Sequence, residues 1–223
     1  MSLQGRTALL AGATGLVGRS CLERLLAHPA YTRVVALVRR PTGMNHDKLQ
    51  ELRADFDALA ELSSLPAVDD VFIALGTTIK AAGSRPAFYK VDHDYVVAVA
   101  ELGRRAGARK LALVSSIGAD AASRNFYLRV KGEAERDVSG LGYEYVEILR
   151  PSLLVGERSE ARTGEAVGIA VMSVVSGLMV GPMRVYRPVD ARDVAAAMIA
   201  SLVSDGTTGV HVRTFDDIRR LAS

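Results

Sequence analysis

Tyr127 and Lys131 are the residues whose types and spacing most directly suggest chemistry. Because they are four positions apart, they would share one face of a helix. A nearby ammonium group favours the phenolate form of a tyrosine, and such a tyrosine can exchange a proton with a carbonyl or alcohol oxygen. That exchange suits a reaction in which hydride moves to or from a nicotinamide. We expect Tyr127 and Lys131 to be catalytic and to contact the cofactor. The alternative is an exposed pair on a helix surface.

Two serines, Ser115 and Ser116, end an apolar run that predicts a strand over residues 110–114. The hydroxyl of one of them could hold the substrate oxygen to which the tyrosine gives its proton. The lysine usage of the chain supports a special role for Lys131. Only five of the 28 cationic residues are lysines, and none follows position 131. A cation placed there without a specific need would more often be an arginine.

Three glycines at three-residue spacing follow an apolar run and precede a helical pattern. A strand, a tight turn and a helix in that order form a phosphate-binding element. The first glycine permits the turn, the second lets backbone N–H groups approach a pyrophosphate, and the third lets the helix lie close to the strand. The cofactor is therefore expected to contact Gly12, Thr14, Gly15, Leu16, Val17 and Gly18.

Arg39 and Arg40 stand at the end of the second predicted strand, where many nucleotide-binding folds have an acidic residue for the ribose hydroxyls. A carboxylate there would repel a 2′-phosphate, whereas a guanidinium group attracts it. The pair predicts NADP(H) rather than NAD(H) as the cofactor. The alternative is a solvated arginine pair in an arginine-rich chain.

Two further segments are expected beside the cofactor. Asp55 could accept a hydrogen bond from the adenine amino group, and Phe56 could cover the adenine ring. A helix cap for Asp55 and a core position for Phe56 are equally open. The cofactor backbone should pass the end of the fourth predicted strand. Leu75 ends that strand, and the small residues Gly76, Thr77 and Thr78 follow it.

The surrounding elements alternate between strand and helix. This alternation predicts an α/β fold, a doubly wound parallel sheet of the Rossmann type, with ligands at the carboxyl ends of its strands. Near-continuous apolar runs fit parallel strands buried on both faces. Strands are expected at Arg6–Ala11, Arg33–Val38, Lys48–Ala54, Asp70–Leu75, Lys110–Val114 and Tyr143–Leu149, with helices at Leu16–Ala27, from Ser84 to Gly107, around Tyr127 and at Asp190–Val203.

The length of 223 residues suits one α/β domain over residues 1–223, and no internal boundary is evident. Residues 157–186 are expected to form a lid or substrate loop, with a helix over 161–180. No charged residue occurs between Ala166 and Met183. This segment approaches the length of a membrane span, but its glycines, proline and serines favour a buried helix or a subunit contact.

Composition argues against several other classes of protein. The net charge of +3 gives little reason to expect nucleic-acid binding. The one cysteine, Cys21, permits no intramolecular disulfide, which together with the absence of a leader signature predicts a cytoplasmic protein. The four histidines lack ligand spacing, so we expect no metal site. A monomer or a homodimer is expected, with an unidentified small carbonyl or alcohol as the substrate.

These motifs together resemble the short-chain dehydrogenases/reductases over roughly residues 3–215. Residues 12–18 look like the glycine pattern of the extended and atypical branches. Residues 113–116, 127–131 and 149–151 are similar to the strand-five, Tyr-x-x-x-Lys and strand-six motifs. Residues 75–78, 115–120 and 127–135 look most similar to the atypical subgroup that includes the HIV Tat-interactive protein.

The resemblance implies that Tyr127 is the acid–base and Lys131 its partner, that Ser116 matches the catalytic serine better than Ser115, and that Pro151 borders the cofactor. Asp92 departs from the family, because many members have an asparagine there that supports a proton relay. Two functions follow. One is an NADP(H)-dependent oxidoreductase, and the other is an NADP(H)-binding regulatory or interaction protein with little or no turnover.

Overall fold

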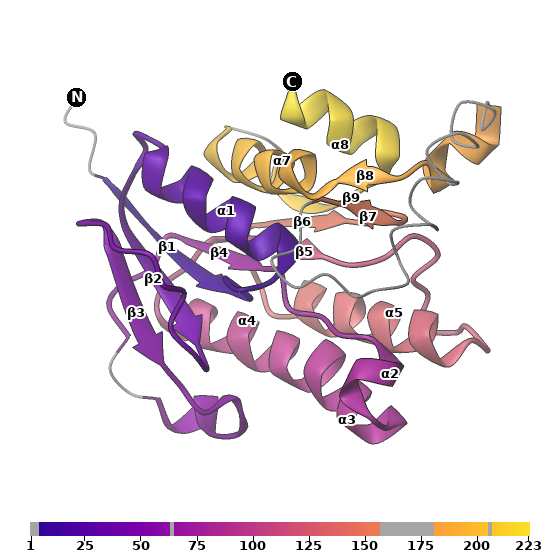
Figure 1. Ribbon diagram of the computed structural model, residues 1–223, viewed down its shortest axis with the longest axis horizontal. Helices are drawn as coiled ribbons and strands as arrows, with labels where there is room; N and C mark the ends of the chain where they lie inside the picture. The colour runs from indigo at the N-terminus through magenta and orange to yellow at the C-terminus, as the bar shows by residue number, and fades with distance from the viewer. Residues whose placement is uncertain (1–4, 63–64, 157–180, 205–206) are drawn as a thin grey trace.

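A parallel sheet of seven strands forms the centre of the molecule (Figure 1). The computed structural model describes residues 5–62, 65–156, 181–204 and 207–223. The strands lie in the order β3-β2-β1-β4-β5-β6-β9, and each neighbouring pair is parallel. Their bounds are β1 (Arg6–Ala11), β2 (Tyr31–Val38), β3 (Leu49–Arg53), β4 (Asp70–Ile73), β5 (Lys110–Val114), β6 (Tyr145–Leu149) and β9 (Gly209–Arg213).

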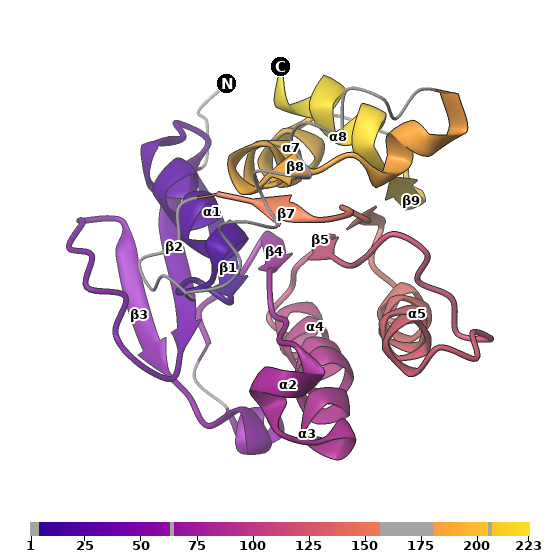
Figure 2. The same ribbon diagram turned by 45° about the vertical axis from the view of Figure 1, so that its right-hand side comes forward.

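Helices cover both faces of this sheet, as Figures 1 and 2 show from two directions. On one face lie α1 (Leu16–Ala27), α7 (Ala191–Val203) and α8 (Phe215–Ala222). On the other lie α2 (Ile79–Ala82), α3 (Arg85–Tyr89), α4 (Tyr95–Arg105) and α5 (Phe126–Ser139). A separate buried apolar cluster fills each interface between sheet and helices. The α/β doubly wound fold expected from the sequence is therefore confirmed.

Strand order reverses between β1 and β4, since β1 continues to β2 on one side while the chain returns to β4 on the other. At such a switch point the loops after the two strands diverge and leave a crevice at the carboxyl edge of the sheet. The glycine loop follows β1, and residues 74–78 follow β4. The fold thus brings two of the predicted cofactor segments to the same crevice.

The long helix expected from Ser84 to Gly107 is divided into three parts. Ser84 caps α3 as expected, since its hydroxyl accepts a hydrogen bond from the Ala87 N–H. A π-helical turn, Lys90–Asp94, then separates α3 from α4. Such turns insert an extra residue and recur at functional sites. The unpredicted short helix α2 precedes them, with Thr78 as its cap.

The remaining elements border the carboxyl edge of the sheet. A small second sheet pairs β7 (Leu154–Val155) with β8 (Val189–Asp190). Residues Gly181–Tyr186 form a 3-10 helix. The expected helix over 161–180 and most of the expected lid over 157–186 lie outside the described residues. Within the described chain, no helix has both the length and the apolar character needed to cross a membrane.

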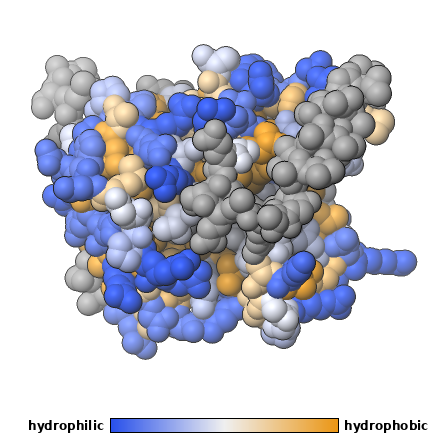
Figure 3. All heavy atoms as spheres, viewed as in Figure 1, coloured by the Kyte–Doolittle hydropathy of each residue, from blue (hydrophilic) through white to orange (hydrophobic). Residues whose placement is uncertain are grey.

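The surface is mixed in character. Polar and apolar residues alternate over the face in Figure 3 without one continuous apolar area among the coloured atoms. Exposed large apolar side chains include Met183 and Tyr186 in the 3-10 helix Gly181–Tyr186, and Val210 and Val212 on the edge strand β9.

Candidate nucleotide-binding and catalytic site

The glycine loop after β1 has no room for a side chain at position 12 or position 18. Gly12 has a φ of +92°, and a Cβ there would lie 2.4 Å from the Ala74 carbonyl oxygen. A Cβ on Gly18 would lie 1.9 Å from the carbonyl oxygen of Gly12, so α1 rests directly on the turn. Only glycine fits both positions, as the sequence predicted.

The start of α1 is open to a negatively charged ligand. Gly15 is its N-cap and supplies no side-chain hydrogen bond, and the first turn contains no acidic residue. Thr14 and Gly15 are exposed, while Val17 is buried in the core. The backbone N–H groups and the positive end of the helix therefore face the crevice, which is the arrangement that binds phosphate. Val17 can contribute only its backbone, and Leu16 is partly exposed.

The loop after β4 forms the other side of the crevice. Leu75 and Thr77 are partly exposed and Gly76 is exposed. A Cβ on Gly76 would lie 3.5 Å from the Lys131 Nζ, so the lysine amine reaches this loop from α5. Thr78 caps α2, because its hydroxyl oxygen accepts a hydrogen bond from the Ala81 N–H. The loop after β4 therefore lies in contact with the buried Lys131–Asp92 pair.

Lys131 forms a buried ion pair with Asp92 of the π-helical turn. The Nζ atom lies 2.7 Å from Asp92 Oδ1, and the side chains are 8% and 0% exposed. The Thr77 N–H donates to Asp92 Oδ2 at 2.9 Å. Burial raises the pKa of the Asp92 carboxyl, and the Lys131 ammonium opposes that rise. The sequence identified Asp92 as unusual but gave no sign that it contacts the lysine.

Tyr127 lies one turn before Lys131 in the first turn of α5. Asn125 caps this helix by accepting a hydrogen bond from the Leu128 N–H at 3.3 Å. The tyrosine is partly exposed, and its ring packs against Phe88, with 5.5 Å between ring centroids. Phe88 is fully buried, so it supports one side of the tyrosine ring. Helix geometry thus places Tyr127 and Lys131 on one face, as expected.

The structure distinguishes the two serines. Ser115 is buried, and its hydroxyl donates to the Glu135 carboxylate. That carboxylate also accepts from the Arg150 guanidinium, with 3.0 Å between Nε and Oε1, and this contact raises the pKa of Arg150. Ser116 is partly exposed, and its hydroxyl makes only a long bond, 3.4 Å, to the Ile117 carbonyl. Ser116 is therefore the serine with a hydroxyl available to a ligand.

Pro151 is buried beside the same loop, where its carbonyl accepts a hydrogen bond from the Ile117 N–H at 2.9 Å. The contact joins the end of β6 to the segment after β5. It places Pro151 next to the loop that carries Ser116.

Arg39 and Arg40 are both exposed directly after β2. A third arginine joins them, because Val38, the last residue of β2, pairs in register with Arg53 at the end of β3. Arg53 is exposed as well. The sequence analysis missed this residue, which only the register of the two strands could have revealed. The three guanidinium groups make the edge after β2 and β3 strongly positive.

The two predicted adenine contacts differ in outcome. Asp55 is exposed and caps the 3-10 helix Phe56–Glu61, where its carboxylate accepts from the Asp57 N–H at 2.9 Å. Phe56 is only 6% exposed, and its ring packs against Tyr95 with 5.4 Å between centroids. The expectation that Phe56 covers the adenine ring is wrong, because this side chain belongs to the core below β1, β2 and β4.

This combination of parallel sheet, glycine turn, open helix end and switch-point crevice defines a Rossmann-type dinucleotide-binding protein. A profile of the NAD(P)H-binding family matches residues 12–205, and the chain belongs to that family. The resemblance to the atypical short-chain dehydrogenases/reductases and to the subgroup of the HIV Tat-interactive protein is confirmed by its relatives.

Three comparisons illustrate this membership. The mitochondrial protein fmp52 of Emericella nidulans is 43% identical over 165 residues, which cover 71% of each chain. The protein HTATIP2 of Rattus norvegicus is 33% identical over 92% of this chain and 84% of its own length. The structure of the human epimerase family protein SDR39U1 with NADPH superposes with a TM-score of 0.62 at 17% identity, covering 93% of this chain and 74% of that one.

The comparisons overturn one expectation. Several relatives, among them the Fmp52 proteins of Emericella nidulans and Eremothecium gossypii, are named mitochondrial, which contradicts the cytoplasmic location expected from the sequence. The expectation rested on a single cysteine and on the absence of a leader signature. The lack of an intramolecular disulfide does not distinguish one disulfide-free compartment from another.

Proposed function

We propose that this protein is an NADP(H)-dependent oxidoreductase that acts on a small carbonyl or alcohol. One observation carries the proposal. Lys131 is buried at the nucleotide crevice, beside Gly76, and on the same helix face as the partly exposed hydroxyl-bearing Tyr127. A lysine in that place can donate a hydrogen bond to the ribose of a nucleotide, one helical turn from the tyrosine that would exchange the proton.

The roles of the residues follow from their positions. A bound nicotinamide would supply or accept a hydride at the substrate carbon. Tyr127 would give the substrate oxygen its proton during reduction and remove it during oxidation. Ser116 would hold that oxygen by a hydrogen bond, and Lys131 would donate to the nicotinamide ribose. The first turn of α1, with the loop at Gly12 and Thr14, would bind the pyrophosphate with backbone N–H groups, while the Gly15 N–H is held by the Gly12 carbonyl at 2.9 Å.

NADP(H) is favoured over NAD(H) by charge. Arg39, Arg40 and Arg53 place three guanidinium groups where the adenosine ribose of a nucleotide in the crevice would end. Guanidinium groups bind a 2′-phosphate bidentately, and NAD(H) has no 2′-phosphate to offset their desolvation.

Calorimetric titration of the nucleotide-free protein with NADPH and NADH tests the cofactor assignment. We expect NADPH to bind at least about tenfold more tightly, which corresponds to about 1.4 kcal/mol. The preference should shrink as salt rises, because the arginines are exposed. Equal affinities would refute the 2′-phosphate assignment, and binding of neither nucleotide would refute the proposed function.

A screen of small aldehydes and ketones with NADPH, run beside Tyr127→Phe, tests the chemistry. The variant lacks the acidic hydroxyl but keeps the ring that packs on Phe88. We expect kcat to fall by about 10²–10⁴-fold with an unchanged Kd for NADPH. Tight NADPH binding without turnover on any substrate would instead favour the regulatory function.

A further inference from the structure

The Lys131–Asp92 pair is unusually well removed from solvent. Both side chains are at most 8% exposed. By contrast, the arginines that pair with the buried carboxylates Asp70, Glu135 and Glu147 keep 24–32% of their side chains exposed. A buried pair of opposite charges is costly to desolvate, so its presence at a catalytic lysine needs a reason beyond stability.

The π-helical turn directs Asp92 toward this lysine. Its neighbour His93 serves a different contact, because its ring bonds to Asp94 at 2.9 Å and to Asp137 of α5 at 3.0 Å. The groups that face the Asp92 carboxylate are the Lys131 ammonium from α5 and the Thr77 N–H from the loop after β4. The carboxylate therefore acts on one charge, that of Lys131.

The position of that charge matters for Tyr127. The tyrosine and the lysine are four residues apart on α5, about 6 Å along the helix axis. An unpaired ammonium one turn away on the same helix face would favour the phenolate form of Tyr127. A carboxylate 2.7 Å from the ammonium cancels most of this effect, since the tyrosine then faces a neutral pair rather than a cation.

We propose that Asp92 is a positioning residue that neutralises Lys131, so that Tyr127 is held as a phenol in the free site. The inference rests on the proposed function and adds the form in which Tyr127 meets the substrate. A phenol is the form that gives a proton to a carbonyl oxygen, whereas alcohol oxidation requires the phenolate.

The proton balance of the step is complete. In reduction, a bound reduced nicotinamide would supply the hydride of the new C–H bond, and the Tyr127 O–H bond would break as its proton moves to the carbonyl oxygen. The products are an alcohol, the oxidised nucleotide and the Tyr127 phenolate, which regains a proton from water. Lys131 stays protonated and paired with Asp92 throughout, and its remaining N–H groups are free for the ribose.

The test is to make the Asp92→Asn variant and to measure its near-ultraviolet tyrosinate absorbance as the pH is raised. Asparagine can still accept the Thr77 N–H but carries no charge. We expect one tyrosine of D92N to ionise about 1–3 pH units below its counterpart in the unaltered protein. That component should be absent from the double variant D92N/Y127F, which assigns it among the seven tyrosines.

Glu101→Gln serves as the matched control, because Glu101 is an exposed carboxylate on α4. It removes the same charge and should leave the titration unchanged. Because the titration requires no turnover, it distinguishes failure of this inference from failure of the proposed function.

Ionisation of Tyr127 at the same or a higher pH in D92N would overturn the proposal. If D92N does not fold, the double variant D92N/K131M leaves no unpaired charge in the core and takes its place. Tyr127 faces no net charge from these two positions in either protein, so its titration in D92N/K131M should match that in the unaltered protein. A displacement of more than about one pH unit in the double variant would also overturn the proposal.

Discussion

Burial and hydrogen bonding give the two neighbouring serines different roles. Ser115 is buried in the network of Glu135 and Arg150, whereas Ser116 has a hydroxyl with only a long internal bond. We expect Ser116→Ala to lower kcat by about 10²-fold or more while leaving thermal stability unchanged, because it removes a hydrogen-bond donor to the reacting oxygen.

Ser115→Ala is the matched control, with the opposite expected outcome. It removes one of the donors to a buried carboxylate and should lower the free energy of unfolding by about 1 kcal/mol. Its kcat should stay within about twofold of the unaltered protein. Steady-state kinetics and thermal melts of both variants decide the assignment, and a large loss of kcat in Ser115→Ala would reverse it.

At the scale of elements, the glycine loop and α1 behave as one unit. Gly18→Ala would force a Cβ to within 1.9 Å of the Gly12 carbonyl oxygen, which is backbone and cannot rotate away. The helix must then shift from the turn, so we expect the Kd for NADPH to rise more than tenfold, with a loss of stability. Calorimetric titration and thermal melts measure both effects.

Gly140→Ala provides the control for that change. Gly140 ends α5 with an ordinary φ of −80°, and a Cβ there would meet its nearest atoms at 3.5 Å. The substitution should leave NADPH affinity unchanged and be neutral or slightly stabilising, because it restricts the unfolded chain. Similar losses of affinity in both variants would show that the loop is not a close-packed turn.

The sequence predicted most of the elements because their patterns are local. The strand Arg6–Ala11 and the helix Leu16–Ala27 have the expected bounds, since an apolar run and an amphipathic repeat leave little ambiguity. The π-helical turn Lys90–Asp94 was not predicted, because one inserted residue does not disturb the apolar repeat visibly. Without that turn, the direction of Asp92 could not be inferred.

Site residues that depend on contacts between elements were also missed. Arg53 joins Arg39 and Arg40 through the register of β2 with β3. The sequence of either strand alone does not indicate this register. For Phe56 the sequence left an adenine contact and a core position equally open, because the choice depends on packing against Tyr95. Tyr127 and Lys131, by contrast, were predictable as a pair because helix geometry alone relates them.

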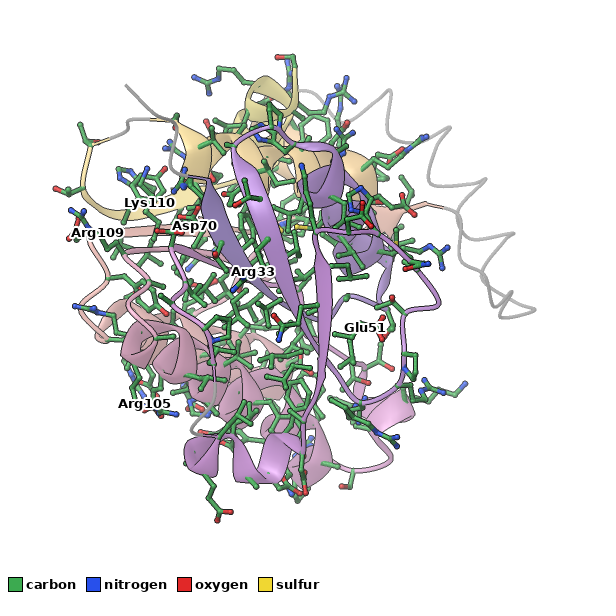
Figure 4. The ribbon with its side chains drawn as sticks, turned by 90° about the vertical axis from the view of Figure 1, so that its left-hand side faces the viewer. Arg33, Glu51, Asp70, Arg105, Arg109 and Lys110 are labelled. Atoms are coloured by element: carbon green, nitrogen blue, oxygen red, sulfur yellow. The ribbon has the colours of Figure 1, made fainter. Side chains whose placement is uncertain are left out.

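At the scale of the whole molecule, stability depends on a buried carboxyl far from the crevice. Asp70 begins β4, is 0% exposed, and accepts hydrogen bonds from the Tyr31 hydroxyl at 2.8 Å and from the Arg6 guanidinium. Lys110 lies close to it at the same edge of the sheet (Figure 4). Burial raises the pKa of Asp70 to about 6, although Arg6 and Tyr31 oppose the rise. Three strands meet at this group, so its ionisation acts on the fold as a whole.

The raised pKa of Asp70 predicts that stability falls as pH rises from about 4 to 6. In that interval the folded protein keeps a proton that the unfolded chain, with an ordinary pKa of 3.8, has lost. The contribution is fully present below the unfolded pKa and is lost as pH rises through the folded one. The shift corresponds to roughly 3 kcal/mol. Urea unfolding midpoints measured between pH 4 and 7.5 should show this decline.

Asp70→Asn isolates the effect from other titrating groups. His28, whose pKa is lowered mainly by partial burial, changes stability in the opposite direction over part of the same range, and both proteins share that contribution. The asparagine keeps a carbonyl for the Tyr31 hydroxyl but cannot ionise. We therefore expect the difference in midpoint between D70N and the unaltered protein to change steadily from pH 4 to 6 and to level off above that. Two parallel curves would mean that Asp70 is already ionised in the folded protein, held charged by Arg6 despite its burial.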